Sequence, residues 1–281
     1  MKLISISGDL CRFAVRLPDL DSPIRRIFPL QRLLEAINTK QMALVSPQHW
    51  DDPREDPAAL CMLDGSQHAA GKSQQPLAAY LAPAWAQCWS MNPGSDTLLR
   101  AYSRVNLDRQ TRRNSDRSNE GVTVTTTVRR LLASAEEWHA FGGDGHVVAG
   151  RVEYLDDKEI WQRLVNACNG EHGPRFFCTV QGRAESLLWK RNYFDHEQEM
   201  RLLLIGRSWQ PGNPLPRVRL VKIDPEALFA SISFDPRLQP FELNERITEL
   251  RTAGYAGEIV RDPSYQKVLS LLVMTRSWPD P

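Results

Sequence analysis

The chain has 281 residues, of which 42% are hydrophobic and 25% charged, as expected for a globular protein with one large domain or two small ones. The 35 Lys and Arg residues balance 34 Asp and Glu residues, so net charge points to no class of partner. No apolar run approaches the roughly 18–20 residues of a membrane span, and the first residues are too polar for a signal peptide. We therefore expect no membrane partner. Five unclustered Cys residues predict reduced thiols in a cytoplasmic protein and no metal site.

Apolar periodicity and turn residues predict the elements of the first half of the chain. The helix at 30–37 is the clearest, because Leu30, Leu33 and Ile37 recur at helical spacing. In chain order the predicted elements are a short strand within 1–22, a strand at 25–28, a helix at 30–37, a strand at 42–45, a turn at 50–53, a loop at 64–78, a strand at 85–90 and a helix at 96–102.

A polar segment at residues 104–120 follows. Its five arginines are Arg104, Arg109, Arg112, Arg113 and Arg117. We interpret it as a solvated, mobile surface loop. Contact with RNA or DNA phosphates is the alternative. Acidic residues interrupt the run, however, and no aromatic residue is interleaved for base stacking.

The second half of the chain alternates strands and helices without an internal repeat. The predicted elements are a strand at 121–126, a helix at 128–138, a strand at 146–152, helices at 157–168 and 184–190, strands at 197–205 and 218–223, a helix that begins at Pro225, a strand at 232–234 and a helix at 240–253. This order indicates an α+β protein.

An acidic pair, Glu197 and Glu199, precedes the strongly apolar strand at 197–205. On a strand the two carboxylates point to one face, where their repulsion needs compensation. Arg201 is the next residue on that face and is the expected partner. Spacing alone favours a Glu–Arg ladder at a surface strand edge over an active centre.

Several motifs occur together in a fixed order. They are Arg26-Ile27-Phe28-Pro29-Leu30, Ser46-Pro47-x-x-Trp50-x-Asp52-Pro53-x-Glu55, Cys88-Trp89-Ser90 with the helix to Tyr102, Gly121-Val122, Lys190 through Glu197-x-Glu199-x-Arg201, Asp224-Pro225 and Asp235-Pro236-Arg237-Leu238. With these motifs the chain resembles a bacterial family known as domain of unknown function 2971, over residues 24–265. The insertion at 104–120 departs from the family pattern.

The motif order also looks like that of ADP-ribosyltransferases, which carry an Arg on an early strand, a Ser on a middle strand and a Glu on a late strand. Arg26, Ser90 and Glu197-Gln198-Glu199 hold those places here. The resemblance implies a split, mostly antiparallel β core with surrounding helices. It implies a domain over 1–210 that includes the Arg-rich insertion, and a small C-terminal α/β appendage over 211–281 packed on it.

The resemblance further implies NAD as the substrate, with a protein or a nucleic acid as the acceptor of ADP-ribose. Glu199 would stabilise the oxocarbenium-like transition state, and Glu197 would orient or deprotonate the acceptor. The implied cofactor-binding residues are Arg26 on the pyrophosphate or ribose, Ser90 on that Arg or the ribose, and Trp89 and Tyr102 stacked on nicotinamide.

The expected activity is therefore ADP-ribose transfer from NAD or NAD hydrolysis, in a toxin or a phage-defence effector. Two alternatives stay open. One is a non-catalytic binding or regulatory module, and the other is a nucleic-acid-acting protein that uses the 104–120 loop. Trp50-Asp51-Asp52-Pro53 is interpreted as a turn with a packed indole ring.

Overall fold

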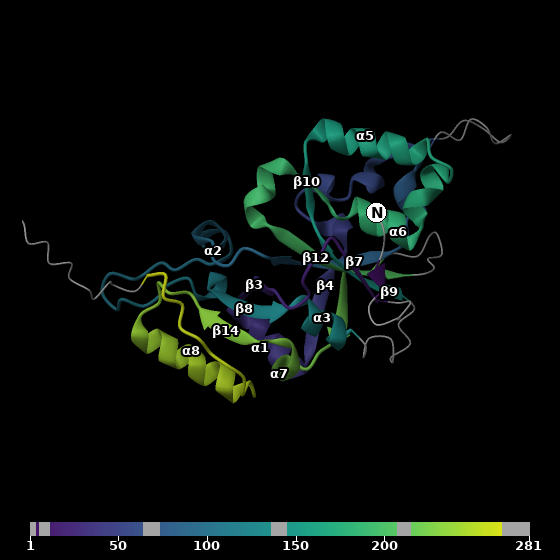
Figure 1. Cartoon of the computed structure of the whole chain (residues 1–281). Helices are drawn as coiled ribbons and strands as arrows, with labels where there is room; N and C mark the ends of the chain where they lie inside the picture. The colour runs from purple at the N-terminus through teal and green to yellow at the C-terminus, as the bar shows by residue number, and fades with distance from the viewer. Residues whose placement is uncertain (1–3, 6–11, 64–73, 136–144, 207–214, 266–281) are drawn as a thin grey trace, which may run out of the picture.

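The computed structural model describes residues 4–5, 12–63, 74–135, 145–206 and 215–265, which form a mixed α/β fold around one large sheet (Figure 1). The strands of this sheet are β1 (Ile4–Ser5), β2 (Arg12–Val15), β3 (Pro23–Pro29), β4 (Gln41–Val45), β7 (Ala84–Ser90), β8 (Gly121–Thr127), β9 (Gly145–Arg151), β12 (Glu199–Gly206), β13 (Val218–Lys222) and β14 (Ser231–Phe234). Two smaller pairs are β5 (Met62–Leu63) with β6 (Gln75–Pro76), and β10 (Glu153–Leu155) with β11 (Trp189–Arg191).

The helices are α1 (Leu30–Thr39), α2 (Asp96–Tyr102), α3 (Val128–Ser134), α5 (Asp157–Cys168), α6 (Val180–Ser186), α7 (Pro225–Leu228) and α8 (Pro240–Thr252). In Figure 1, α5 and α6 lie at one end of the molecule and α8 at the other. The large sheet is mostly antiparallel, which confirms that part of the expected fold; its parallel pair is β2 with β9.

Most predicted elements are present, with one exchange of type. The helix expected at 184–190 ends earlier, as α6 at Ser186. Trp189–Arg191 instead forms β11, because its backbone pairs with β10 in parallel and the Trp189 ring is buried beneath α5. Residues 64–73 of the predicted loop and 136–138 of the predicted helix lie outside the described residues.

Strand β12 lies at the centre of the sheet. It pairs with β7 on one edge and β9 on the other, and all its residues are buried. Met200, Leu202 and Leu204 face the larger core cluster, which includes residues of α1 and α3. Leu203 and Ile205 face a second cluster together with α6. Burial on both faces explains the apolar run at residues 202–205 of this strand.

The edge of β7 opposite β12 is shared by two strands that diverge. Within the described residues β3 meets this edge at Arg25 and Ser90, and β4 meets it at Val45 and Ala86. Between these two bridges lies Cys88. We call this gap between β3 and β4 along β7 the split.

The C-terminal segment is part of the same sheet. After residue 215, β13 pairs with β4 and β14 pairs with β8. The predicted C-terminal appendage over 211–281 thus contributes two strands to the sheet of the predicted first domain. Strand β13 extends the sheet beyond β4, and β14 extends it beyond β8 on the side of β3.

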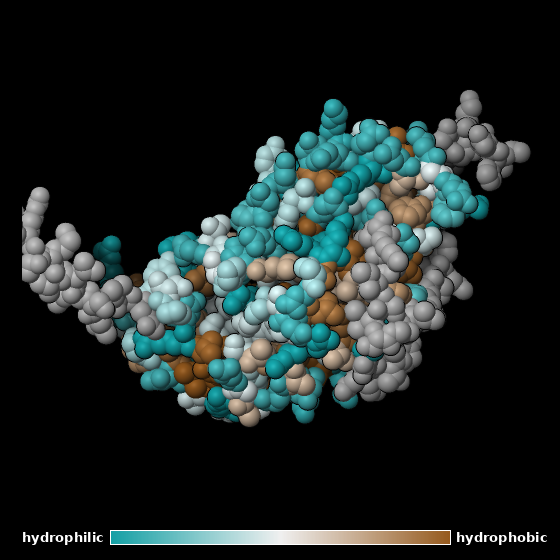
Figure 2. Space-filling view, in the orientation of Figure 1, coloured by the Kyte–Doolittle hydropathy of each residue, from teal (hydrophilic) through white to brown (hydrophobic). Residues whose placement is uncertain are grey.

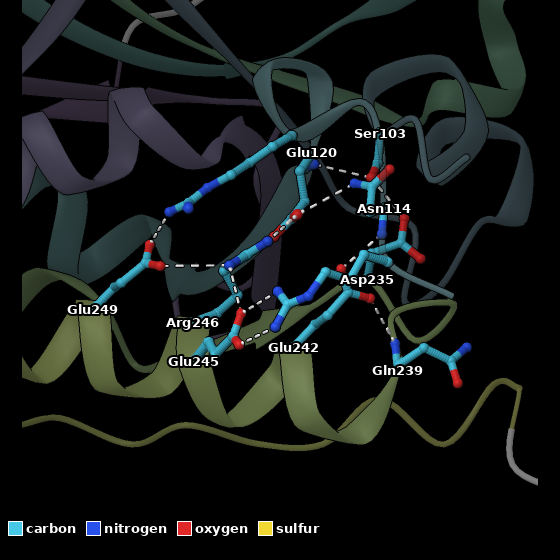
Figure 3. A network of polar contacts seen from close by, with 12 residues as sticks. Ser103, Asn114, Glu120, Asp235, Gln239, Glu242, Glu245, Arg246 and Glu249 are labelled. Carbon is cyan, nitrogen blue, oxygen red and sulfur yellow. Dashed lines mark hydrogen bonds and ion pairs between the residues drawn. The ribbon is translucent and has the colours of Figure 1, made fainter. Parts of the chain in front are cut away.

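The Arg-rich segment 104–120 is fastened to α8 (Figure 3). Buried Arg246 donates to both carboxylate oxygens of Glu120, at 2.8 and 3.2 Å. Glu242 accepts a hydrogen bond from the backbone N–H of Asn114 at 2.7 Å. At the surface Arg113 binds Glu245 and Arg117 binds Glu249. The segment that was predicted to be a mobile surface loop is therefore held by α8. The buried residues of α8 include the charged Glu242 and Arg246, which bind polar groups of this segment.

The face of the molecule in Figure 2 is mostly hydrophilic, with smaller apolar areas between polar ones. Among the described residues, no helix is both long and apolar enough to cross a membrane.

The buried pair of Arg246 and Glu120 predicts a large stability loss when one partner is removed. We expect Arg246→Met to lower the free energy of unfolding by about 3–5 kcal/mol, because it leaves the Glu120 carboxylate buried without a counter-charge. Arg117→Met removes a more exposed pair of the same network and is expected to cost less than about 1 kcal/mol. Urea unfolding of both variants measures the difference, and equal losses would contradict this account of the network.

Candidate active site

The acidic pair does not lie on one strand. Glu197 ends a 3-10 helix, η7 (Asn192–Glu197), whereas Glu199 is the first residue of β12. Gln198 between them has a φ of 44°, a left-handed conformation that turns the chain. The two carboxylates nevertheless converge, because Lys190 Nζ lies 2.7 Å from Glu197 Oε2 and 3.0 Å from Glu199 Oε2.

Glu199 is buried, with 3% of its surface exposed, and it is surrounded by donors. Arg201 Nε donates to its Oε1 at 2.9 Å, which confirms the expected partner. Lys190 Nζ and Arg201 Nη2 donate to its Oε2 at 3.0 and 3.2 Å. Burial raises the pKa of Glu199, but Arg201 and Lys190 outweigh burial and lower it to about 2. The carboxylate therefore stays ionised at neutral pH.

Arg201 is fully buried, and each of its donors has an acceptor. Nη1 donates to the Leu187 carbonyl at 2.7 Å, and Nη2 to Glu55 Oε2 at 2.5 Å. Its guanidinium carbon lies 4.6 Å from the centre of the Trp50 ring. Burial lowers the pKa of Arg201, but Glu199, Cys88 and Glu55 together outweigh burial and raise it above its ordinary value. Arg201 is thus a permanent cation inside the sheet.

Lys190 is shared by three carboxylates. Besides Glu197 and Glu199 it binds Glu55 Oε1 at 3.3 Å. Burial lowers the pKa of Lys190, but these carboxylates raise it overall. We call Glu55, Glu197, Glu199, Lys190 and Arg201 the charge cluster. It holds one more anion than cations, an arrangement that favours positive charge nearby.

Sequence reasoning missed Glu55 as a site residue. The turn at 50–53 is present and the Trp50 ring packs on Arg201, but the following Glu55 enters the charge cluster. Its neighbours Asp52 and Asp56 bind Arg191 and Arg183. Burial raises the pKa of Glu55. The available signal was the motif Trp50-x-Asp52-Pro53-x-Glu55, which carries more carboxylates than a plain turn needs.

Arg26 occupies the split. Its Nη1 donates to the carbonyl of Cys88 at 2.5 Å, and its guanidinium lies 5.1 Å from the centre of the Phe28 ring. Its Nε is buried and has no hydrogen-bond partner among the described residues. Burial lowers the pKa of Arg26, while Cys88, Tyr102 and Glu199 act in the opposite direction. Arg26 therefore lies within the electrostatic reach of Glu199 without forming an ion pair with it in the described part of the chain.

Cys88 lies between these two groups. Burial raises the pKa of its thiol, and the Glu199 charge raises it further. The thiol consequently stays protonated at neutral pH and is not a nucleophile in this environment.

Ser90 holds the turn and not Arg26. It lies opposite Glu199 in the sheet. Its hydroxyl donates to the backbone carbonyl of Glu197 at 2.6 Å and accepts a hydrogen bond from the backbone N–H of Asn92 at 3.1 Å. Ser90 therefore fixes the backbone position of Glu197, from which the Glu197 side chain extends.

The two predicted stacking residues differ in exposure. Trp89 is 2% exposed, its indole N–H donates to Gln87, and its ring packs against Phe28 in the core. It therefore has no open face for nicotinamide here. Tyr102 ends α2 and is 58% exposed. Burial raises the pKa of the Tyr102 phenol, and the charge of Glu197 raises it further.

The structure thus brings Arg26, Glu197, Glu199 and Tyr102 around Cys88, assigns Ser90 to the backbone and leaves Trp89 in the core. A hollow of about 370 Å³ lies elsewhere, between α5 and α6, and no residue of the charge cluster lines it.

No protein-family model and no curated protein sequence matches this chain. Among solved structures it is similar to DarT from Thermus sp. 2.9 in complex with ADP-ribosylated ssDNA, at 11% identity and a TM-score of 0.37, covering 88% of this chain and 97% of that chain. The complex of the same protein with NAD+ matches at 11% identity and a TM-score of 0.33, covering 87% and 96%. The complex with carba-NAD+ matches at 12% identity and a TM-score of 0.33, covering 86% and 95%. At these values the similarity does not decide the fold or the activity.

The low pKa of Glu199 predicts a pH-dependent contribution to stability. Its folded pKa of about 2 lies below the ordinary 4.5, so the contribution is complete above pH 4.5 and is lost as the pH falls toward 2. We expect Glu199→Gln to cost roughly 3 kcal/mol at neutral pH and progressively less below pH 4.5.

Urea unfolding of both proteins at several pH values measures this difference. Glu55 acts in the opposite sense because its pKa is raised, so the comparison must be between the wild type and the single variant. A difference that stays constant down to pH 3 would argue against an ionised, paired Glu199.

Proposed function

We propose that the chain cleaves the bond between nicotinamide and ribose in NAD and passes ADP-ribose to an acceptor or to water. The observation that carries the proposal is Arg26. It is a guanidinium at the split whose buried Nε has no hydrogen-bond partner among the residues that the structure describes, and it lies within the electrostatic reach of an ionised Glu199. A cation that lacks a carboxylate partner suits the pyrophosphate of a dinucleotide, since guanidinium donors match phosphate oxygens.

The reaction gives the charge cluster a purpose. When the glycosidic bond breaks, its electron pair goes to the nicotinamide nitrogen, and neutral nicotinamide leaves. The ribose carbon becomes part of an oxocarbenium-like cation. The carboxylates of the cluster favour that cation over the ground state, and Glu199 supplies charge that is already fixed before the reaction.

Glu197 is the better placed carboxylate for direct contact. Its Oε2 binds Lys190, whereas its Oε1 accepts no hydrogen bond from the described residues. Its side chain is 17% exposed, against 4% for Glu199. We assign Glu197 to the acceptor: its open oxygen takes the proton from the attacking hydroxyl or water as the new bond to the ribose carbon forms.

Tyr102 is the aromatic residue that supports nicotinamide binding in this proposal. It is exposed and lies within the electrostatic reach of Glu197, so a planar ring can pack on it without rearrangement of the core. Trp89 has no part in it, because its ring is buried against Phe28.

We also propose that the chain is a member of the family with domain of unknown function 2971 and that it acts as a toxin or a phage-defence effector. The ordered motifs around Arg26, Ser90 and Glu199 support this. Transfer of ADP-ribose to a protein or a nucleic acid would alter that acceptor, whereas hydrolysis would consume NAD.

A non-catalytic binding module is the second candidate, and one observation favours it. Arg201 and Lys190 together direct three N–H groups at Glu199, so its lone pairs are largely occupied. In that case the charge cluster is a structural element, and a dinucleotide is held at the split without being cleaved.

Removal of the Glu199 charge tests catalysis. With NAD as substrate and free nicotinamide followed over time, we expect Glu199→Gln to lower the rate by at least about 100-fold. Arg246→Met is the control, since it is expected to be destabilised by a similar amount and its ion pair with Glu120 is not part of the charge cluster. Glu197→Gln should slow transfer to an acceptor more than nicotinamide release. Equal release by wild type and Glu199→Gln would remove catalysis from this site.

Removal of the Arg26 charge tests binding separately. We expect Arg26→Met to weaken NAD affinity by about 10–100-fold, because one or two charged hydrogen bonds to phosphate are lost. Isothermal titration of wild type, Arg26→Met and the surface control Arg117→Met measures the change. NAD binding that depends on Arg26 but yields no nicotinamide would favour the non-catalytic module, and absence of binding by the wild type would reject both.

A further inference from the structure

Strand β13 is an edge of the large sheet. Among the described residues no further segment covers it, whereas a later segment covers the edge strand β14. The one partner of β13 among the described residues is β4. At the other end of the sheet β14 is covered: Ile259 bridges Ile232, whose N–H donates to the Glu258 carbonyl and whose own carbonyl accepts from Val260. An uncovered edge presents backbone donors and acceptors to a further strand.

Two residues of β13 direct their backbone groups outward. The Ser46 N–H donates to the Arg217 carbonyl at 2.9 Å, and the Ile223 N–H donates to the Lys40 carbonyl at 2.9 Å. Residues 217 and 223 therefore face β4, and alternation in an antiparallel ladder gives 219 and 221 the same direction. Val218 and Leu220 consequently point their N–H and C=O groups away from β4.

The side chains at the same two positions are apolar and open. Val218 is 42% exposed and Leu220 is 60% exposed, and both lie on one face of the strand. On the other face Val221 is buried and the Arg219 guanidinium lies 5.2 Å from the centre of the Trp85 ring. At this edge the outward backbone groups of Val218 and Leu220 have no partner among the described residues. The apolar side chains that are exposed belong to the same two alternate positions.

The charges on this strand have one sign. Arg217 and Arg219 are exposed, and residues 215–222 contain no Asp or Glu. A second copy of the chain would bring like charges together across a shared ladder, which is unfavourable. The same cations oppose unspecific edge pairing, so a binding strand must compensate them with negative charge.

We propose that β13 binds an extended acidic segment of a partner protein by β-strand addition. The backbone of Val218 and Leu220 supplies the hydrogen bonds, their side chains pack on apolar residues of the incoming strand, and the Arg217 and Arg219 guanidiniums select acidic residues beside them. This surface is separate from the charge cluster, so the proposal does not depend on NAD cleavage.

A labelled peptide of about eight residues that alternates valine with glutamate is the probe, and its matched control carries lysine in place of glutamate. Fluorescence anisotropy with the full chain should show saturable binding of the glutamate peptide that weakens as salt is raised, and no binding of the lysine peptide. Equal binding of both peptides, or binding of neither, would overturn the proposal.

Val218→Pro tests the backbone contact, because it removes an outward N–H and keeps the hydrogen bonds to β4. We expect it to weaken the glutamate peptide at least about tenfold. Leu220→Glu leaves the backbone unchanged but adds a negative charge that repels the glutamates of the peptide, and it should weaken binding by a similar factor. Leu60→Ser, a change at another apolar residue that is 57% exposed, should leave binding unchanged. Unaltered affinity in both β13 variants would exclude strand addition.

Discussion

The Arg201 guanidinium is the constraint on which the other features of this fold depend. A cation buried in the central strand costs several kcal/mol unless opposite charge and hydrogen-bond acceptors surround it. Glu199, Glu55 and the Leu187 carbonyl supply these, and the Trp50 ring covers the guanidinium. The contacts of this one side chain thereby hold the end of α6 and the turn that follows β4 against β12, and they orient the side chain of Glu199 at the start of β12.

The same constraint explains why a structural and a chemical interpretation of the charge cluster need not compete. The residues that neutralise Arg201 are held rigidly by one another, so their charges cannot reorganise when a substrate arrives. Preorganised charge of this kind stabilises a transition state at little further cost. Lys190 extends the arrangement from the buried Glu199 to the more open Glu197 and so links the interior to the surface.

The sequence allowed good prediction of elements with a strong period and of contacts between near neighbours. The helices near 30–37 and 157–168 and the apolar strand before residue 206 follow from their periods, and Arg201 with Glu199 follows from a spacing of two. Glu55 was not predictable in this way, since 146 positions separate it from Arg201. The role of Ser90 also depends on a backbone carbonyl across the sheet, which no side-chain pattern reveals.

The position of β12 has a consequence for how the chain folds. This strand comes late in the sequence, yet it lies between β7 and β9, which were both made earlier and pair through it. Neither neighbour can complete its ladder until residues 199–206 enter, so closure of the sheet involves long loops and is expected to be a slow, late event. The bond between Glu55 and Arg201 cannot form until then. The charge cluster is therefore completed in the last step of folding, and an incomplete chain that ends before β12 lacks both Glu199 and Arg201.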